Sequence, residues 1–220
     1  MPESGASALS TETAITSDLL ERVASVLRSH SIDVAIVDTA DEARATVLAL
    51  VPEGAQVLAL VPEGAQVHSG KSKTLEDVGL YSELMESGRY DALRPKLFAM
   101  DRATQAAEMR RLIAAPDFMI GSVAAVTEDG ALVAASATGS QLGPYAATAG
   151  RLILVVGSQK IVPDLDAALR RIREVVFPYE NAQVQARLGV DTILEKVLII
   201  FGEWIAGRTT VILVRDPVGI

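Results

Sequence analysis

The sequence predicts an α/β protein with a mostly parallel, Rossmann-like sheet that is flanked by helices and extended by an added hairpin. Hydrophobic residues make up 50% of the 220 residues but aromatic residues only 4%, so the core must consist of Ala, Val, Leu and Ile. Short runs rich in Val and Ile alternate with helical patterns, as in sheets that carry helices on both faces. A chain of this length buries about 70% of its unfolded surface and needs no metal or disulfide to fold.

The start of the chain predicts a helix, a strand and a second helix in that order. Residues 14–29 place five aliphatic side chains on one helical stripe: Leu19, Leu20, Val23, Val26 and Leu27. Residues 32–38, IDVAIVD, form a short run of strand type, and residues 41–50 return to helical spacing. Residues 1–13 are polar and predict a flexible tail, which leaves 14–220 as a single α/β domain.

A doubled decapeptide follows the second helix. Residues 48–67 read LALVPEGAQV twice, so one set of ten residues duplicates the other. Ten is an even number, so a shift by one copy keeps a strand's side chains on the same faces, whereas it rotates a helical stripe by about 80°. Pro52 and Pro62 also disfavour one continuous helix. We therefore expect the first LAL to end the helix, the second AQV to lead into HSGKS, and the surplus to form a loop or strand.

The middle of the chain is predominantly helical. Residues 74–80 predict a short helix capped by Ser72 or Thr74, and residues 81–115 predict polar helices. Residues 117–136 then contain two apolar runs joined by Glu128, Asp129 and Gly130, which predicts a hairpin. The remaining expected elements are strands at 151–157, 197–202 and 209–214 and a helix at 164–176. The total is six or seven strands.

Composition excludes several classes of function. The net charge of −8 argues against nucleic-acid binding, which favours a basic surface. The chain has no cysteine, so it offers no disulfide, thiolate zinc site, iron–sulfur cluster or cysteine nucleophile. Its two histidines lie far apart in a sequence without a ligand cluster, so we expect no metal and no cofactor. No apolar run is long enough for a membrane span, and no signal pattern begins the chain, which predicts a cytoplasmic protein.

The GKS at residues 70–72 resembles a phosphate-binding loop but fails its spacing. A Walker A motif places four residues between its first Gly and GK, whereas five separate Gly64 from Gly70. The same segment still lies where a strand ends and a helix begins, and such helix N-termini bind anions without a Walker motif. The candidate ligand-binding residues here are Ser69, Gly70, Lys71, Ser72 and Thr74. A plain strand-to-helix turn would have a similar sequence.

A second polar loop, SATGSQLGP at 136–144, supplies hydroxyls and backbone N–H groups in a compact turn. Its candidate ligand-binding residues are Thr138, Gly139, Ser140 and Gln141. With the 69–74 segment it is predicted to form two walls of one cleft at the carboxyl ends of the strands. Lys160, in the turn GSQK, could meet an anion at the same edge. A connecting loop and a solvated lysine remain the alternatives.

Four blocks, in order, resemble the lactate-utilisation (LUD) domain family: SGKSKTLEDVGL, IGSVAAVTEDGALVAASATGSQLGP, VVGSQKIVPDLDAALRRIREVVFP and TTVILVRDPVGI. The resemblance runs from about residue 18 to the end. It implies a sheet of the isomerase/CoA-transferase-like type and a cytoplasmic bacterial protein. Some members are subunits of a lactate-oxidation system. Because the chain has no cysteine, it resembles the small LUD-only subunit and not the iron–sulfur partner of that subunit.

The resemblance also suggests one catalytic residue. In the superfamily's CoA-transferases a Glu near a turn like TEDG is the nucleophile, which makes Glu128 the candidate here. Acidic hairpin tips are, however, commonly just solvated.

Two hypotheses for function follow, with a purely structural scaffold as a third interpretation. The first is an accessory or small-anion-binding subunit linked to lactate utilisation, with lactate-oxidation subunits as partners and homo-oligomerisation left open. The alternative is a stand-alone acyl- or phosphosugar-transforming enzyme that uses the cleft with Glu128.

Overall fold

The computed structural model describes residues 17–51, 66–70, 72–101 and 103–220. The α-helices are α1 (Ser17–Ser29), α2 (Ala40–Leu50), α3 (Lys73–Asp77), α4 (Leu80–Glu86), α5 (Leu93–Ala99), α6 (Ala106–Ala114), α7 (Leu165–Arg171) and α8 (Phe177–Leu188). Two π-helical turns, η1 (Pro144–Thr148) and η3 (Ile172–Val176), and one 3₁₀ turn, η2 (Ser158–Lys160), accompany them. The strands are β1 (Asp33–Val37), β2 (Gln66–Ser69), β3 (Asp91–Ala92), β4 (Phe118–Gly121), β5 (Ala125–Thr127), β6 (Leu132–Ser136), β7 (Arg151–Gly157), β8 (Ile161–Val162), β9 (Lys196–Ile200) and β10 (Thr209–Val214).

The main sheet confirms the predicted α/β class. Its six strands run in the order β1-β10-β7-β4-β2-β3, and every neighbouring pair is parallel. Strand β7 is buried on both faces: Leu152 and Leu154 point into one core, whereas Ile153 and Val155 point into the other. Burial on both faces is the reason that these strands are continuous apolar runs in the sequence.

The predicted hairpin is present, but it belongs to a second sheet. β5 and β6 are antiparallel and form a four-stranded sheet in the order β8-β5-β6-β9, and Gly130 in the turn has a positive φ of 86°. The first apolar run is divided between the two sheets: β4 ends in the main sheet at Gly121, and β5 begins the second sheet at Ala125. The expected six or seven strands are therefore ten among the described residues, two of them only two residues long.

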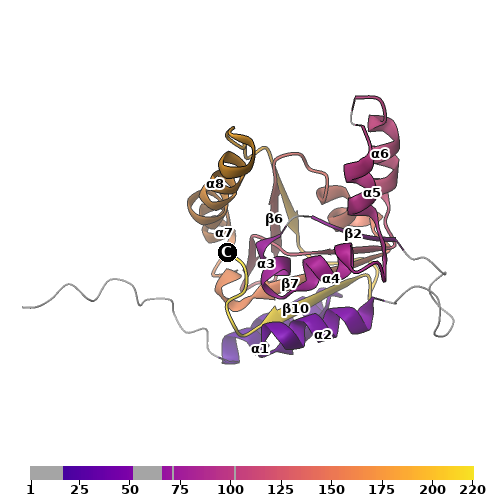
Figure 1. Ribbon diagram of the computed structural model, residues 1–220. Coiled ribbons are helices and arrows are strands. Elements are labelled where there is room, and N and C mark those ends of the chain that lie inside the picture. The colour runs from indigo at the N-terminus through magenta and orange to yellow at the C-terminus, as the bar shows by residue number, and fades with distance from the viewer. Residues whose placement is uncertain (1–16, 52–65, 71, 102) are drawn as a thin grey trace, which may run out of the picture.

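Three cores hold the layers together. Helices α2, α3 and α4 cover one face of the main sheet, and α1 and the second sheet cover the other. The outer face of the second sheet packs against α7 and η3 through Ala125, Val133, Ala168 and Ile172. Helices α5 and α6, and the α8 end of the helical path that begins at α7, project from the body as two arms (Figure 1). The predicted arrangement, one sheet with helices on both faces, does not include these projecting arms. They lie on either side of the site described below.

The helix expected at 164–176 is longer than predicted. Asp164 caps it, with its carboxylate accepting a hydrogen bond from the Ala167 N–H, and the helical path continues through η3 and α8 to Leu188. Pro178 lies just inside α8. A proline cannot donate to the carbonyl four residues earlier and clashes with it in a regular helix, so the wider π turn before Pro178 lets the helix continue.

Both ends of the doubled decapeptide agree with the prediction. Helix α2 ends at Leu50, in the first LAL, and β2 begins at Gln66, in the second AQV. The expected extra loop or strand falls on residues 52–65, which lie outside the described residues, as does the expected tail 1–13.

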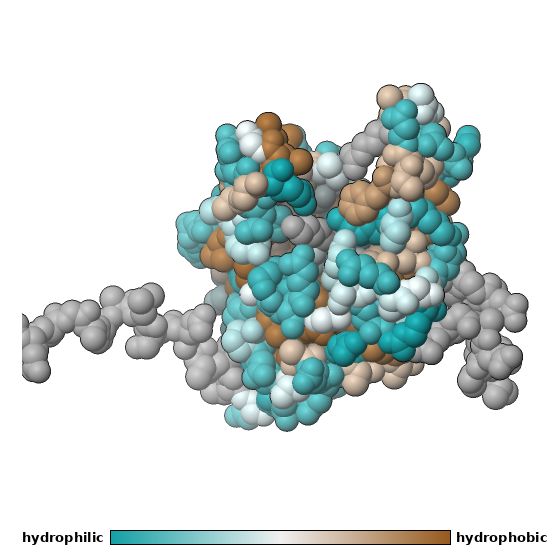
Figure 2. Space-filling view, in the orientation of Figure 1, coloured by the Kyte–Doolittle hydropathy of each residue, from teal (hydrophilic) through white to brown (hydrophobic). Residues whose placement is uncertain are grey.

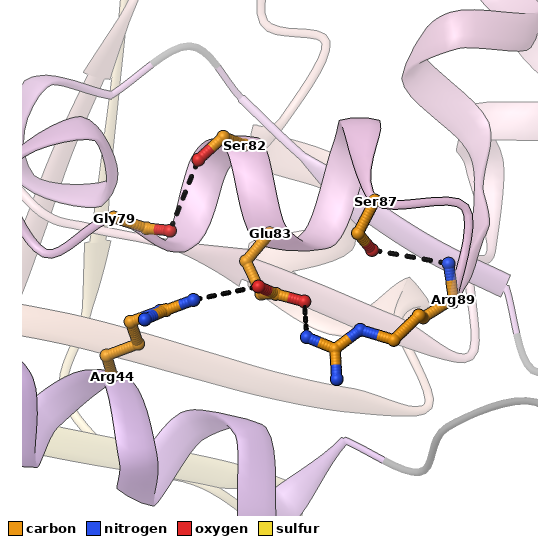
Figure 3. Close-up of polar contacts among 6 residues, drawn as sticks. All are labelled: Arg44, Gly79, Ser82, Glu83, Ser87 and Arg89. Atoms are coloured by element: carbon orange, nitrogen blue, oxygen red, sulfur yellow. Dashed lines mark hydrogen bonds and ion pairs between the residues drawn. The ribbon is translucent and has the colours of Figure 1, made fainter.

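Helix α4 is fastened to α2 by a carboxylate between two arginines (Figure 3). Glu83 in α4 accepts a hydrogen bond from Arg44 in α2 at 2.8 Å and a second from Arg89, which follows α4. Burial alone would raise the pKa of the Glu83 carboxyl, but the hydrogen bonds from Arg89 and Arg44 hold that pKa below its usual value. Because Arg89 lies between α4 and α5, these contacts also hold the chain shortly before α5 begins.

The connection between the two sheets depends on a close packing of Tyr145 on Gly121. Tyr145 is fully buried, and its hydroxyl accepts a hydrogen bond from the Ser122 N–H at 3.2 Å and donates one to the Ser122 carbonyl at 3.1 Å. A Cβ atom on Gly121 would overlap the Tyr145 hydroxyl and lie 2.7 Å from the nearest atom of its ring. Position 121 therefore tolerates no side chain while Tyr145 keeps its place.

We predict that Gly121→Ala destabilises the protein by about 1–3 kcal/mol, the usual cost of overpacking a core. Gly143→Ala is the matched control, because its φ is −61° and its nearest neighbour would lie 3.9 Å from the new Cβ. The control should be neutral or stabilising by up to about 1 kcal/mol. Chemical denaturation of the three proteins measures both effects, and equal stability of the two variants would contradict the packing argument.

Candidate functional site

A cavity of about 560 Å³ lies between the two arms, at the carboxyl ends of β2 and β4. Figure 2 shows the hollow between the projecting arms. Open parallel sheets bind ligands at this edge, where the strands end and the following loops diverge. The volume is in the range of pockets that hold metabolites and drug-sized molecules.

The two predicted polar loops meet in this cavity. Its lining includes Gly70, Ser72 and Thr74 from the first loop and Thr138, Ser140 and Gln141 from the second. A Cβ atom on Gly70 would lie 2.9 Å from the Gln141 side-chain oxygen, so the two loops are in contact. The structure thus brings together the two walls expected from sequence. Whether these residues bind a ligand stays a prediction.

Three of the candidate residues do not line the cavity or cannot be placed. Ser69 is buried below it, and its side-chain oxygen has no hydrogen-bond partner among the described residues. Gly139 has a positive φ of 82° and packs near the Lys196 side chain, so it shapes the second loop. Lys71 lies outside the described residues.

Lys160 lies at the base of the cavity and is only 3% exposed. Its Nζ donates to Thr74 Oγ1 at 2.7 Å, to Ser122 Oγ at 3.0 Å and to the Val123 carbonyl at 3.4 Å. Thr74 was expected as a helix cap, but its hydroxyl serves this network and donates to Ser122 Oγ at 3.3 Å. Ser72 occupies the N-cap position of α3 without a side-chain capping bond.

The Lys160 amine titrates far below an ordinary lysine. Burial, with a smaller contribution from the positive charge of Arg171, lowers the pKa of Lys160 to about 7, and Asp77 acts in the opposite direction. No carboxylate among the described residues forms a salt bridge with Lys160; its hydrogen-bond partners are two hydroxyls and a carbonyl. The neutral and protonated forms of the Lys160 amine therefore have similar free energies near pH 7, and a group with such a pKa is suited to accept and return a proton.

Two further polar residues of the cavity were not among the sequence candidates. Burial, followed by the charge of Arg94, lowers the pKa of His68 to about 4, so the imidazole is neutral near pH 7. Its Nδ1 has no hydrogen-bond partner among the described residues. Arg94 donates to the Ser69 carbonyl at 3.2 Å, and its guanidinium lies 5.1 Å from the centre of the Phe98 ring. Nothing in the polar pattern of residues 81–115 distinguished Arg94 from its neighbours.

Ser122 was also missed. It follows β4 directly, lines the cavity and touches Lys160. A polar residue at the end of a buried strand was the available signal, but the sequence does not show that the chain leaves the main sheet at this residue.

The upper walls of the cavity are apolar. One arm contributes Leu97, Phe98, Met109 and Ile113. The other contributes Val176, Phe177, Val184 and Leu188 beside the charged Glu180 and Arg187, and the segment after α8 adds Ile193 and Leu194. Phe98 is 69% exposed, Leu188 61% and Ile193 58%. Exposed apolar side chains that face a shared hollow are typical of a binding site.

Glu128 lies away from this cavity. It is exposed on the β5–β6 turn, where its backbone N–H donates to the Val162 carbonyl, and it is not among the lining residues. The neighbouring Gly130 packs against Val26 and His30 near the end of α1. The carboxylate that does line the cavity, among the described residues, is Glu180 of α8.

The described residues contain no group of three or more His, Cys, Asp or Glu side chains arranged to hold a metal ion. Nor does this part of the chain include a helix with the length and apolar character needed to cross a membrane.

The chain belongs to the LUD domain family, whose model matches residues 20–214. Among solved structures it is similar to a DUF162 family protein from Deinococcus radiodurans, with 15% sequence identity and a TM-score of 0.47. That match covers 90% of this chain and 96% of the other. A comparison with curated proteins gave no match.

We predict that Lys160 makes stability rise with pH. Between about pH 7 and pH 10.5 the unfolded chain keeps this lysine protonated while the folded protein holds it mostly neutral. The unfolded state then binds more protons, so raising the pH stabilises the folded state by up to about 1.4 kcal/mol per pH unit. Below pH 7 both states are protonated and the effect ends.

The measurement is the unfolding free energy of the wild type minus that of Lys160→Met between pH 6 and pH 10. This difference should increase above pH 7. The same subtraction with Lys96→Met, which removes an exposed lysine, serves as the control. A flat difference for Lys160→Met would contradict the depressed pKa.

Proposed function

We propose that this LUD-domain protein binds a small anionic metabolite with an apolar portion, as an accessory or ligand-binding subunit linked to lactate utilisation. The arrangement of charge and apolar surface in the cavity is the main support. The basic side chains that line it are Lys73, Arg94, Lys160 and Arg187, and Glu180 supplies the one side-chain carboxylate among the described lining residues. Lys73 is paired with Asp77, and burial lowers the pKa of Lys160 to about 7, so Arg94 and Arg187 carry most of the excess positive charge. The excess of positive charge in a protein with a net charge of −8 favours an anion at this place.

The position of these groups suggests how a ligand is oriented. Lys160 and the two polar loops lie at the base, and the aliphatic and aromatic side chains form the upper walls. A carboxylate would accept hydrogen bonds from donors at the base, and its carbon chain would cover the exposed Phe98, Leu188 and Ile193. An anion without a carbon chain would contact only the polar base of the cavity, and an apolar chain without an anionic group would contact only its upper walls.

We expect hexanoate to raise the melting temperature in a thermal-shift assay, whereas hexanol and acetate at the same concentration raise it much less. Hexanol keeps the apolar chain and acetate keeps the carboxylate, so the two controls separate the contributions. No stabilisation by any of a panel of carboxylates and organic phosphates would overturn the proposed ligand class.

Arg94→Gln should weaken hexanoate binding about tenfold, because it removes one charged donor from the cavity. Lys96→Gln in the same helix is the matched control; Lys96 is paired with Asp91 and does not line the cavity. Isothermal titration calorimetry measures both. Equal losses in the two variants would assign the effect to overall charge.

The lactate-linked role rests on membership of the LUD domain family. We expect deletion of the gene to slow growth of its host on lactate and to leave growth on glucose unchanged. Complementation with the wild-type gene should restore growth on lactate. Growth of the deletion strain on lactate at the wild-type rate would contradict the link, without bearing on ligand binding.

A further inference from the structure

We propose that Ser122 and Lys160 form a nucleophile and general-base pair that cleaves esters or thioesters of apolar carboxylic acids in this cavity. This inference rests on the proposed function, since the carboxylate ligand would be the product of the reaction. It assigns chemistry to two residues that lie far apart in the chain and meet at the base of the cavity.

The geometry is that of a hydroxyl activated by an amine. Ser122 Oγ lies 3.0 Å from Lys160 Nζ, within the range for direct proton transfer. Lys160 is 3% exposed, and its other partners are the Thr74 hydroxyl and the Val123 carbonyl. An amine that is buried without a carboxylate partner readily loses its proton, which is the condition under which lysine replaces histidine as the base in serine–lysine pairs.

Ser122 is the better nucleophile of the two hydroxyls that touch Lys160. Both residues line the cavity, but Thr74 is only 1% exposed, whereas Ser122 is partly exposed and therefore the more accessible of the two. The Tyr145 hydroxyl holds its backbone N–H and carbonyl, and its Oγ accepts hydrogen bonds from Lys160 Nζ and Thr74 Oγ1, so these contacts position the hydroxyl before a substrate arrives. A fixed nucleophile reduces the entropy lost on reaching the transition state.

The proposed reaction balances without a cofactor. Lys160 takes the Ser122 Oγ proton while Oγ forms a bond to the acyl carbonyl carbon. As the carbon–sulfur or carbon–oxygen bond breaks, the Lys160 ammonium returns the proton to the leaving thiolate or alkoxide. A water molecule then gives one proton to the same amine while its oxygen attacks the acyl carbon on Ser122. As the bond between that carbon and Oγ breaks, the Lys160 ammonium returns the proton to Oγ, which releases the carboxylic acid and restores the serine hydroxyl and the neutral amine. The apolar walls would hold the acyl chain throughout.

The test uses a hexyl fluorophosphonate, which phosphonylates an activated serine irreversibly, with peptide mass spectrometry to locate the adduct. We expect the label on Ser122 in the wild type and no label at this peptide in Ser122→Ala. Lys160→Met and Lys160→Arg should label at least about 100-fold more slowly. Ser82→Ala removes an exposed serine outside the cavity and should behave as the wild type.

Two further measurements keep the result interpretable if a Lys160 variant folds poorly. The wild-type labelling rate should rise with pH through the titration of Lys160, whose charged neighbours are Arg171 on α7 and Asp77 on α3. Hydrolysis of p-nitrophenyl hexanoate and of a hexanoyl thioester should show the same dependence and distinguish the two leaving groups.

Stabilisation by hexanoate without labelling of Ser122 would overturn the nucleophile and leave the proposed binding function intact. A label on Lys160, or on Glu128, would also overturn it, since another side chain would then be the nucleophile. Failure of hexanoate to bind would instead reject the proposed function itself.

Discussion

The packing of Tyr145 against Gly121 is the constraint on which the rest of the structure depends. The chain leaves the parallel sheet immediately after Gly121 and enters the second sheet at Ala125. The Tyr145 hydroxyl bonds to both the N–H and the carbonyl of Ser122, so the backbone groups released at the end of β4 are satisfied inside the protein. This joint places Ser122 beside Lys160, sets the second sheet against α1, and lets α7 and η3 cover that sheet's outer face. The cavity is therefore a consequence of where one strand stops.

The same region of the protein buries the amine of Lys160 next to Ser122. Lys160 is separated from solvent by a hydroxyl pair, a backbone carbonyl and the close approach of Gly219, and it finds no carboxylate partner among the described residues. Retaining an amine there costs stability near neutral pH, because the charged form loses its hydration. A structural role alone would be served equally well by an apolar side chain of similar size. A lysine at this position, and the loss of stability that its burial causes, is explained if a substrate or ligand interacts with the amine.

The exposed apolar side chains on the two arms belong to the same arrangement. Phe98 and Leu188 come from helices that are far apart in sequence, and both line the cavity. These arms bury little of their own surface: α5 buries only Leu93, and α6 and α8 contain no buried residue. Helices that bury little against their own domain keep their apolar surface for another molecule. The protein thus combines a rigid polar base with walls that are held less tightly.

The sequence by itself determined the class of fold, most of the strands and the two polar loops, because burial on both faces of a parallel sheet leaves continuous Val, Leu and Ile runs, and loops leave Gly and Ser. The same local signals determined that α2 ends within the first LAL, at Leu50. Only the tertiary structure decided that residues 117–127 split between two sheets, that the helix passes through Pro178 by a π turn, and that Ser122 and Arg94 join the cavity while Glu128 stays outside it. These outcomes depend on contacts between segments tens of residues apart, such as Gly121 with Tyr145 and Thr74 with Lys160. No local pattern of hydrophobicity, capping or turn residues records contacts of that kind.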